Sequence, residues 1–229
     1  CPMLKACARI LLVLSALPAF QVVAQAEQAY EPISFGEYWN ADLAFTYTAW
    51  DSLGDLVPAG RGGPFETSGA GWDATIEVSL ARVGSSVMFV GFNVGMIGFN
   101  SDVFLEDDDA SNTSALDLTY AVGTLNFRFG EGRKQYFDID VGLGVYNAGN
   151  LYIDCSAIPD EDCLGSEVNS TPIGGYIGAS WAIWRGLKLA GRVHYADFGT
   201  IGSIGPESGT LEGPMYTAQI GWEFGDWSR

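Results

Sequence analysis

Charged side chains recur at two-residue intervals within otherwise apolar, alternating stretches of the sequence. In a strand, residues two apart project from the same face, so these charges share a polar face opposite an apolar one. An unpaired buried charge is strongly destabilising, so charges of both signs inside a fold must be paired and hydrogen-bonded. Such a set predicts either an ionic plug that fills an interior or a narrow hydrophilic path through it. This polar-face charge set consists of Asp42, Asp73, Glu77, Arg128, Asp138, Asp140, Lys188, Arg192 and Glu223.

His194 is the single histidine, the residue type most often used as a general base. Its neighbourhood, His194-Tyr195-Ala196, resembles the His-x-Ser motif of lipid A deacylase barrels. Ala196 replaces the serine, so the nucleophile that the histidine would activate is missing. His194 also falls on the polar face, whereas acyl chains would be met from the lipid side. The sequence therefore predicts a structural interior histidine and no enzyme, with a lipid-modifying enzyme as a weaker alternative.

Two acidic runs lie in polar segments between the alternating stretches. Clustered carboxylates form a solvated, repulsive surface, and this is the simpler interpretation. They also suit Ca²⁺ or Mg²⁺, although neither run matches an EF-hand loop. The sequence thus predicts no cofactor beyond divalent cations, which would bridge these loops to lipopolysaccharide phosphates. The weak metal candidates are Glu106, Asp107, Asp108 and Asp109, and the second run is at 160–162.

Cys155 and Cys163 enclose a short polar segment, CSAIPDEDC. Behind a secretory signal they would reach an oxidising compartment, where a disulfide closing this small loop is predicted. A redox-active or metal site is the alternative, which a chain with one histidine disfavours.

The N-terminus has the pattern of a secretory signal peptide. Lys5 and Arg9 form a positive region, an apolar core occupies 10–17, and Ala24-Gln25-Ala26 is a small-residue cleavage site defined by Ala24 and Ala26. The apolar run is too short for a membrane-spanning helix. The mature chain is therefore expected to begin at residue 27.

Composition excludes several classes of function. All 28 acidic residues but only nine of the 11 basic residues follow Ala26, which gives the mature chain a net charge of −19. This excess of acidic residues argues against nucleic-acid binding, which needs a basic face, and against docking on anionic lipid, which needs a polybasic patch. Glycine, at 30 of 229 residues, has about twice its usual share of roughly 7%, which suits a β-protein with many turns.

Eight alternating segments follow the signal, and the connections between them alternate long and short. Each segment is long enough to cross a bilayer when tilted, which needs roughly 9–11 residues. Short turns on one side and long loops on the other are typical of outer-membrane barrels. The predicted fold is all-β, an eight-stranded antiparallel up-and-down transmembrane β-barrel. Its strands are expected at 38–50, 71–81, 87–99, 115–129, 136–146, 172–184, 187–198 and 215–224.

The segment at 115–129 breaks the regular pattern. Its apolar face begins with Leu116, Leu118, Tyr120 and Val122 and continues one position out of step at 125–129. A β-bulge at Gly123 would absorb one residue and restore the outward apolar face. The bulge also predicts that Arg128 faces inward.

The apolar faces carry almost no charge, as lipid requires, since Arg or Lys at the midplane costs roughly 2–4 kcal/mol. A soluble lipocalin-like barrel is the alternative, with its apolar face lining a cup. Trp39, Trp72, Trp181, Trp184 and Trp222 fall near strand ends, where aromatic girdles occur. Because the interior of an eight-stranded barrel is just wide enough to be filled by side chains, the charge set favours a plug.

The last strand ends in Gln219-x-Gly221-Trp222-x-Phe224, a polar residue, a glycine and alternating aromatics. This ending resembles the signal by which outer-membrane barrels are recognised by their assembly machinery. The chain resembles the small eight-stranded group that includes the OmpA transmembrane domain, OmpX and OmpW. The predicted organisation is a removed signal peptide at 1–26, a periplasmic lead-in at 27–37, a barrel at 38–225 and a tail at 226–229.

The resemblance implies an outer-membrane location in a Gram-negative bacterium, reached through the periplasm. The expected partners are outer-membrane lipid, lipopolysaccharide and, during biogenesis, the barrel assembly machinery, with a monomer favoured. The predicted function is a structural or surface-interaction role through long extracellular loops. A narrow pore or transporter for small solutes, as the OmpW resemblance implies, is the alternative.

Overall fold

The computed structural model describes residues 32–55, 67–104, 111–130, 135–153, 171–184, 186–204 and 207–226. The signal segment with Ala24 and Ala26, the acidic run 106–109 and the pair Cys155 and Cys163 lie outside these residues. Their cleavage, metal-binding and disulfide assignments stay predictions.

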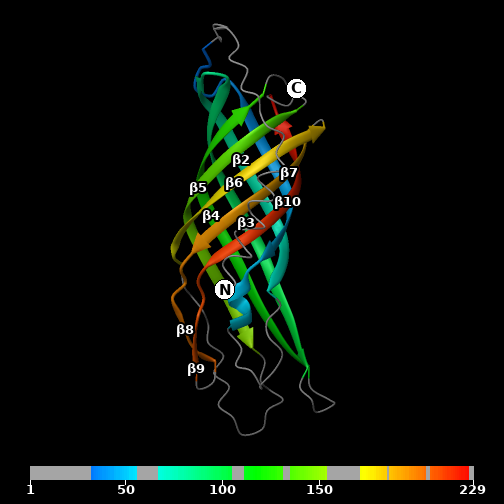
Figure 1. The fold of residues 1–229 in the computed structure, drawn as a ribbon, viewed down its shortest axis with the longest axis vertical. Coiled ribbons are helices and arrows are strands. Elements are labelled where there is room, and N and C mark those ends of the chain that lie inside the picture. The colour runs from blue at the N-terminus through cyan, green and yellow to red at the C-terminus, as the bar shows by residue number, and fades with distance from the viewer. Residues whose placement is uncertain are drawn as a thin grey trace, which may run out of the picture. The chain divides into compact units, whose positions relative to one another are not determined.

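Eight strands close into one antiparallel barrel (Figure 1), in the order β1-β10-β7-β6-β5-β4-β3-β2. The predicted fold class is confirmed. The connections β2–β3, β4–β5 and β6–β7 are short and meet at one end of the barrel, and the other connections, of which β1–β2, β5–β6 and β7–β10 are long, meet at the opposite end. We call these the short-turn end and the loop end. The strands are β1 Trp39–Ala49, β2 Ser68–Val83, β3 Ser86–Phe104, β4 Ser111–Phe129, β5 Tyr136–Ile153, β6 Ile173–Trp184, β7 Leu187–Ala196 and β10 Pro214–Gly225.

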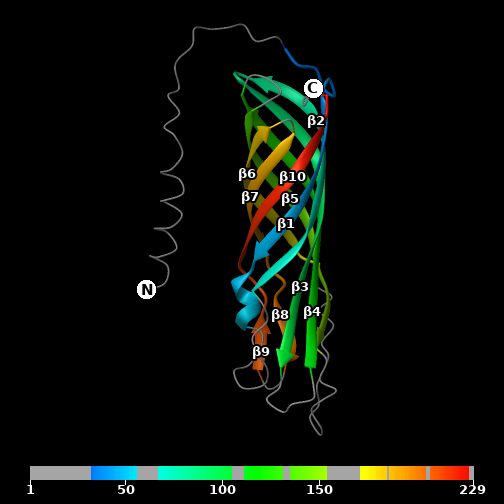
Figure 2. The same ribbon diagram turned by 90° about the vertical axis from the view of Figure 1, so that its right-hand side faces the viewer.

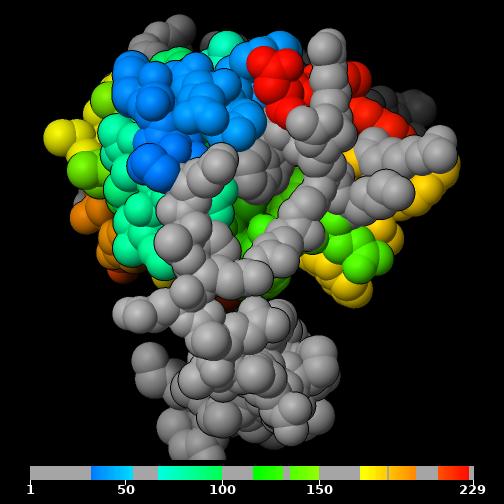
Figure 3. Space-filling model, turned by 90° about the horizontal axis from the view of Figure 1, so that it is seen from above, coloured from blue at the N-terminus to red at the C-terminus, as the bar shows by residue number. Residues whose placement is uncertain are grey.

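The barrel closes by pairing of its first and last strands. β1 and β10 are antiparallel neighbours from Asn40↔Gly225 to Ala49↔Tyr216, and Figure 3 shows them side by side on the rim, in blue and red. In the segment that precedes β1, the backbone amide of Gly36 donates to the carbonyl of Ser79. The Ser79 amide in turn donates to the carbonyl of Tyr38. These bonds hold the lead-in segment against β2 at the short-turn end.

The loop end is more ordered than the sequence predicted. The 3₁₀ helix η1 (Asp51–Asp55) follows β1, and a separate hairpin of β8 (Thr200–Ile204) and β9 (Glu207–Thr210) occupies the expected last loop. β3, β4 and β5 also continue past their predicted ends at 99, 115 and 146, and stay paired as far as Phe104↔Ser111 and Ser114↔Ile153. Figure 2 shows β3 and β4 running on toward the loop end, at which β8 and β9 also lie.

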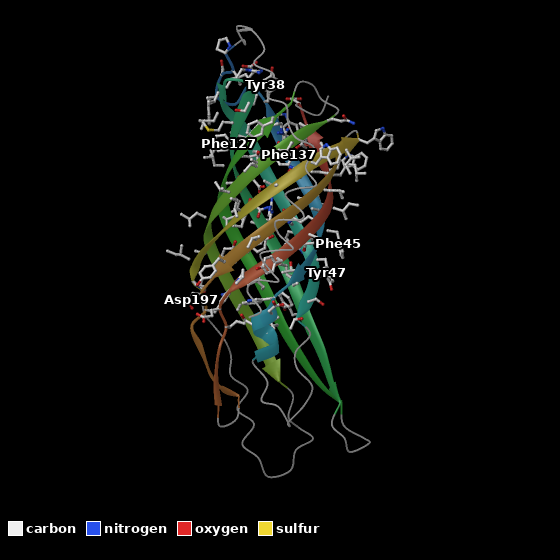
Figure 4. The ribbon with its side chains drawn as sticks, in the orientation of Figure 1. Tyr38, Phe45, Tyr47, Phe127, Phe137 and Asp197 are labelled. Atoms are coloured by element: carbon white, nitrogen blue, oxygen red, sulfur yellow. The ribbon has the colours of Figure 1, made fainter. Side chains whose placement is uncertain are left out.

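Along the strands, exposed apolar residues alternate with buried polar ones. Leu43, Phe45 and Tyr47 are more than half exposed on the outside of β1, whereas Thr46 and Thr48 are fully buried inside. Figure 4 shows Phe45 and Tyr47 on the outer surface, and Tyr38, Phe127 and Phe137 toward the short-turn end. The period of two thus puts one face of each strand outside and the other in the lumen.

The predicted bulge at Gly123 is wrong. β4 pairs with β3 without interruption from Ser111 to Phe129, and its one shift against β5 lies between Ala115 and Asp117. Even-numbered residues therefore face inward along this strand, so the apolar group expected to face lipid lies buried in the lumen. The apolar residues so misplaced are Leu116, Leu118, Tyr120 and Val122.

Their placement reflects a lumen with two different halves. Toward the loop end the interior is apolar, with Trp50, Leu53, Phe99 and Phe198 packed beside the inward residues of β4. Toward the short-turn end it is ionic. An apolar side chain can be buried either by lipid or by a packed interior, so hydrophobicity alone does not show which way it points.

Glycines in the lumen make room for tyrosine rings from neighbouring strands. A Cβ built on Gly142 of β5 would overlap the ring of Tyr176 on β6, and one on Gly95 of β3 would overlap Tyr120 on β4. Gly123 differs, because the heavy atom nearest to its Cβ would be the Leu143 carbonyl oxygen at 3.9 Å. Inward glycine is thus a packing requirement, and outward glycine at 123 is not.

We expect Gly142→Ala to destabilise the barrel by about 1–3 kcal/mol, because the Tyr176 ring must leave its position. Gly123→Ala is the matched control, and it should leave stability unchanged or raise it by about 0.4–1 kcal/mol. Urea-unfolding midpoints of the two variants and the parent in the same detergent measure the difference. Equal effects of both substitutions would show that the tyrosine contact does not require glycine.

Candidate functional site

All nine residues of the polar-face charge set lie on the lumen side of their strands. They come from β1, β2, β4, β5, β7 and β10, and they form two layers. The layer nearer the short-turn end is built on Arg128 and Lys188, and the layer nearer the middle on Arg192.

Arg128 connects opposite walls of the barrel. Its Nε and Nη2 donate to Asp138 of the adjacent strand β5 at 2.9 and 3.0 Å, and Nη1 and Nη2 donate to Glu223 of β10 at 3.2 and 2.7 Å. β10 lies four places from β4 in the ring of eight, directly across the lumen. The guanidinium also lies over the rings of Phe89 and Tyr136, with 4.9 and 3.9 Å from Cζ to the ring centroids. Paired bidentate bonds of this kind fix both direction and distance.

Lys188 extends this layer around the wall. Its Nζ lies 2.9 Å from Asp42 Oδ2, 3.3 Å from Asp138 Oδ2 and 3.8 Å from Glu223 Oε2. Asp138 and Glu223 are therefore shared between the lysine and Arg128. Five side chains from five strands form one network across the lumen.

Arg192 organises the second layer. Its Nη1 donates to Asp73 Oδ2 at 2.9 Å, its Nε donates to Asp140 Oδ2 at 3.1 Å, and its Cζ lies 4.4 Å from the centroid of the Tyr176 ring. Asp73 also accepts bonds from the Tyr120 hydroxyl at 2.6 Å and from Asn93 Nδ2 at 2.8 Å. This carboxylate is thus held by donors from three other strands.

Glu77 belongs to neither ion-paired group. Asn126 Nδ2 donates to its two carboxylate oxygens at 3.1 and 3.4 Å. Within the described part of the chain, no Lys or Arg forms an ion pair with it. Its side chain is nevertheless buried.

His194 marks the boundary between the ionic and apolar halves. Its ring is buried, its Nδ1 lies 3.0 Å from the Tyr146 hydroxyl, and the rings of Tyr120, Tyr146 and Tyr176 lie 5.2, 6.0 and 5.1 Å away between centroids. Ala196 also faces inward and is fully buried. The histidine lies on the lumen face, as strand parity predicts.

The layers leave little free space between them. A chamber of about 20 Å³ lies between the Lys188 and Arg192 groups, enough for about one water molecule. Among the described residues, no group of three or more His, Cys, Asp or Glu side chains is placed to hold a metal ion, and no helix is long and apolar enough to span a membrane.

Sequence reasoning missed the neutral partners of the charges. Tyr120 was assigned to the outer face, and Asn126 and Tyr146 were not singled out, although each hydrogen-bonds inside the lumen. The signal that could have found them is unbroken parity through Gly123, which puts Tyr120, Asn126 and Arg128 on one face.

The assembly-signal residues occupy both faces of β10. Trp222 and Phe224 are exposed on the outside, and Gln219 is buried in the lumen. Gly221 pairs with Ala44 of β1, and its missing side chain avoids a clash with that residue.

Fold and lumen together define an eight-stranded β-barrel of the outer-membrane type. The outer membrane protein OprG from Pseudomonas aeruginosa superposes on it with a TM-score of 0.50 at 11% identity, over 83% of this chain and 97% of that chain. The expected resemblance to small outer-membrane barrels is thereby confirmed at the level of the fold.

Two further solved structures also match. Neisserial surface protein A does so with a TM-score of 0.38 at 14% identity, over 85% of this chain and 98% of that one. Ail, the attachment invasion locus protein of Yersinia pestis, in complex with the heparin analogue sucrose octasulfate, does so with 0.44 at 8% identity, over 84% and 100%. No protein-family model matches the chain, and no curated protein sequence does.

Arg128→Met should destabilise the barrel by about 3–5 kcal/mol, because it leaves Asp138 and Glu223 buried with only the more distant Lys188 between them. The triple variant Arg128→Met/Asp138→Asn/Glu223→Gln removes the uncompensated charge together with the pair. It should recover much of the loss, as replaced buried ion pairs often do. Urea-unfolding midpoints test this, and a triple variant no more stable than the single one would contradict the charge-pairing account.

Proposed function

We propose that this protein is an outer-membrane barrel of a Gram-negative bacterium whose lumen is closed and whose function lies at the loop end. The observation that carries the proposal is the Arg128–Glu223 ion pair, which joins opposite walls of the lumen. An interior crossed by buried, bidentate bonds favours a rigid plug over an aqueous path. The proposed role is to hold an interaction surface in the membrane.

The outer surface supports membrane insertion. Large apolar side chains are exposed on every barrel strand, among them Leu143, Ile173, Ile177 and Ile220, each at least half exposed. Soluble monomers rarely expose continuous apolar surface of this extent. Trp39, Trp181, Trp184 and Trp222 add exposed rings at the short-turn end, where an aromatic girdle would meet the membrane interface. Outer-membrane lipid and lipopolysaccharide are the partners that this surface implies, with export by the predicted signal peptide and insertion by the barrel assembly machinery.

The sheet extension of β3, β4 and β5 beyond the barrel wall is the proposed interaction surface. β6 pairs with β5 only up to Val145↔Ile173, and β2 pairs with β3 only up to Ala70↔Gly98. Among the described residues, 147–153 of β5 and 99–104 of β3 therefore pair with a strand on one side only, and that strand is β4. A strand edge of this kind presents free backbone donors and acceptors, to which an extended peptide can add as a further strand.

The alternatives have weaker support. A transporter for small solutes would need a continuous path past both ionic layers and the apolar half of the lumen. A lipid-modifying enzyme would need a nucleophile beside His194, whose ring instead contacts three tyrosines. We propose no catalytic role and a monomeric barrel.

The refolded protein should show no steady ion conductance in a planar bilayer, because ion-paired side chains occupy the lumen. A shift in gel mobility on heating checks beforehand that the barrel is folded. Lys188→Ala combined with Arg192→Ala should also be silent if the tyrosine and apolar layers close the path by themselves. Steady conductance of the unmodified barrel would overturn the closed-lumen proposal in favour of the pore.

The part of the extension formed by β3 and β4 can be removed without shortening the barrel wall, and 147–152 of β5 then keeps its pairing with 115–119 of β4. We would delete 101–114 and join Asn100 to its register partner Ala115 through an Asn-Gly turn. Peptides selected from a random phage library on the unmodified barrel should bind this variant at least about tenfold more weakly, since each lost hydrogen bond contributes about 0.5–1.5 kcal/mol.

The matched control replaces the β8–β9 hairpin, residues 200–210, with a Gly-Ser linker and keeps the extension. Peptide binding should survive in this control. Selected peptides that bind the shortened variant as well as the parent would show that the β3–β4 part of the extension is not the interaction surface.

A further inference from the structure

The lumen contains more negative than positive side chains. Of the polar-face charge set, Arg128, Lys188 and Arg192 are the three cations, and six carboxylates surround them. Each cation contacts at least two of the carboxylates within 4 Å. Glu77 is the carboxylate left without such a contact in the described residues, and only the amide of Asn126 bonds it. A buried carboxylate without an ion-pair partner is destabilising, so a positive charge bound next to Glu77 would stabilise the fold.

The chamber beside Glu77 has the size and lining to receive it. Its volume of about 20 Å³ holds one particle of about the size of a water molecule. Asp42, Asn126 and Gln219 line it together with Glu77. The side chains of Lys188 and Arg192 also reach its wall, each with its carboxylate partners, so four carboxylates and two basic groups surround the space. This is a space inside the ionic half of the lumen, enclosed by strands and apart from the loop end.

Three of the lining groups carry buried atoms with no hydrogen-bond partner. Asn126 Oδ1 and Asp42 Oδ1 are acceptors without a donor. The amide nitrogen of Gln219 is a donor without an acceptor. Asn126 and Gln219 are 2% and 6% exposed. A half-turn of the Gln219 amide exchanges its nitrogen for its oxygen. The Asn126 and Asp42 oxygens on the chamber wall thus lack a donor or cation, and the Gln219 amide can present its oxygen as a third such group after this rotation.

We propose that the lumen binds one monovalent metal cation, Na⁺ or K⁺, between Glu77 and the side-chain oxygens of Asp42, Asn126 and Gln219. A divalent ion fits less well, because Ca²⁺ takes six to eight oxygen ligands and Mg²⁺ usually keeps several waters. The described residues also hold no group of three or more acidic, His or Cys ligands. The cation neutralises the carboxylate that the basic residues leave unpaired and holds β1, β2, β4 and β10 together. This site does not depend on the proposed interaction surface.

Unfolding of the refolded barrel in salts of different cations tests the proposal. Urea midpoints are measured at equal ionic strength in NaCl, KCl and N-methyl-D-glucamine chloride, whose cation is too large for the chamber. A small cation should raise the midpoint, and each tenfold increase above its dissociation constant should raise the folded-to-unfolded ratio about tenfold. Equal midpoints in all three salts would overturn the proposal and would leave either a protonated Glu77 or a charged Glu77 that is solvated by a bound water.

Glu77→Gln is the decisive variant, because it keeps the shape of the side chain and removes the charge. Its midpoint should no longer depend on the cation. Glu212→Gln, at an exposed carboxylate of the loop end, is the matched control and should keep the dependence of the parent. Cation dependence retained in Glu77→Gln would place the effect elsewhere and overturn the proposed site.

Crystals of the unmodified barrel grown with Tl⁺, an anomalous scatterer that replaces K⁺, give a readout that does not rely on variant folding. An anomalous peak in the chamber beside Glu77 is the expected result. Crystals whose chamber shows no anomalous peak would overturn the proposal, whatever the unfolding data show.

Discussion

The arrangement of this barrel depends on one buried guanidinium. Arg128 is fully buried and binds Asp138 on the neighbouring strand and Glu223 on the opposite wall. Removing a charged group from water is costly, and only well-placed partners offset that cost. The register of β4 against β5 and the closure of β1 on β10 are what bring the three groups together. A slip of one residue would turn Arg128 toward lipid, so the ion pair also specifies the strand register.

The lumen changes character along its length. Ion pairs fill it near the short turns, a group of three tyrosines and His194 lies next, and aliphatic and aromatic side chains pack toward the loops. Inward glycines such as Gly95 and Gly142 leave room for the tyrosine rings. Both halves are filled, although by different chemistry. A filled lumen gives a rigid support, which moves the search for a function to the loop end and to the small polar chamber among the ion pairs.

The surplus of carboxylates in the lumen and the singly paired strand edges at the loop end have one property in common. In each, groups that normally have partners lack them in the described part of the chain: Glu77 has no Lys or Arg within ion-pair distance, and 147–153 of β5 lacks a second neighbouring strand. The proposed partner of the buried charge is a small cation, and that of the strand edge is an extended peptide. The two needs differ in size and chemistry, so each proposed site stands or falls independently of the other.

The sequence by itself determined the barrel strands, their alternating connections and the side on which eight of the nine charges lie. It placed Arg128 inward only by invoking a bulge at Gly123 that the structure does not contain. A period of two is a local property, and turn and loop lengths can be read directly. It did not determine that Leu116 to Val122 face inward, because lipid and a packed lumen bury apolar side chains equally well. Nor did it show that Arg128 meets Glu223, or that Glu77 has no Lys or Arg within ion-pair distance among the described residues. Those contacts depend on which strands face each other across the closed barrel and on their stagger, and only the tertiary structure decides both.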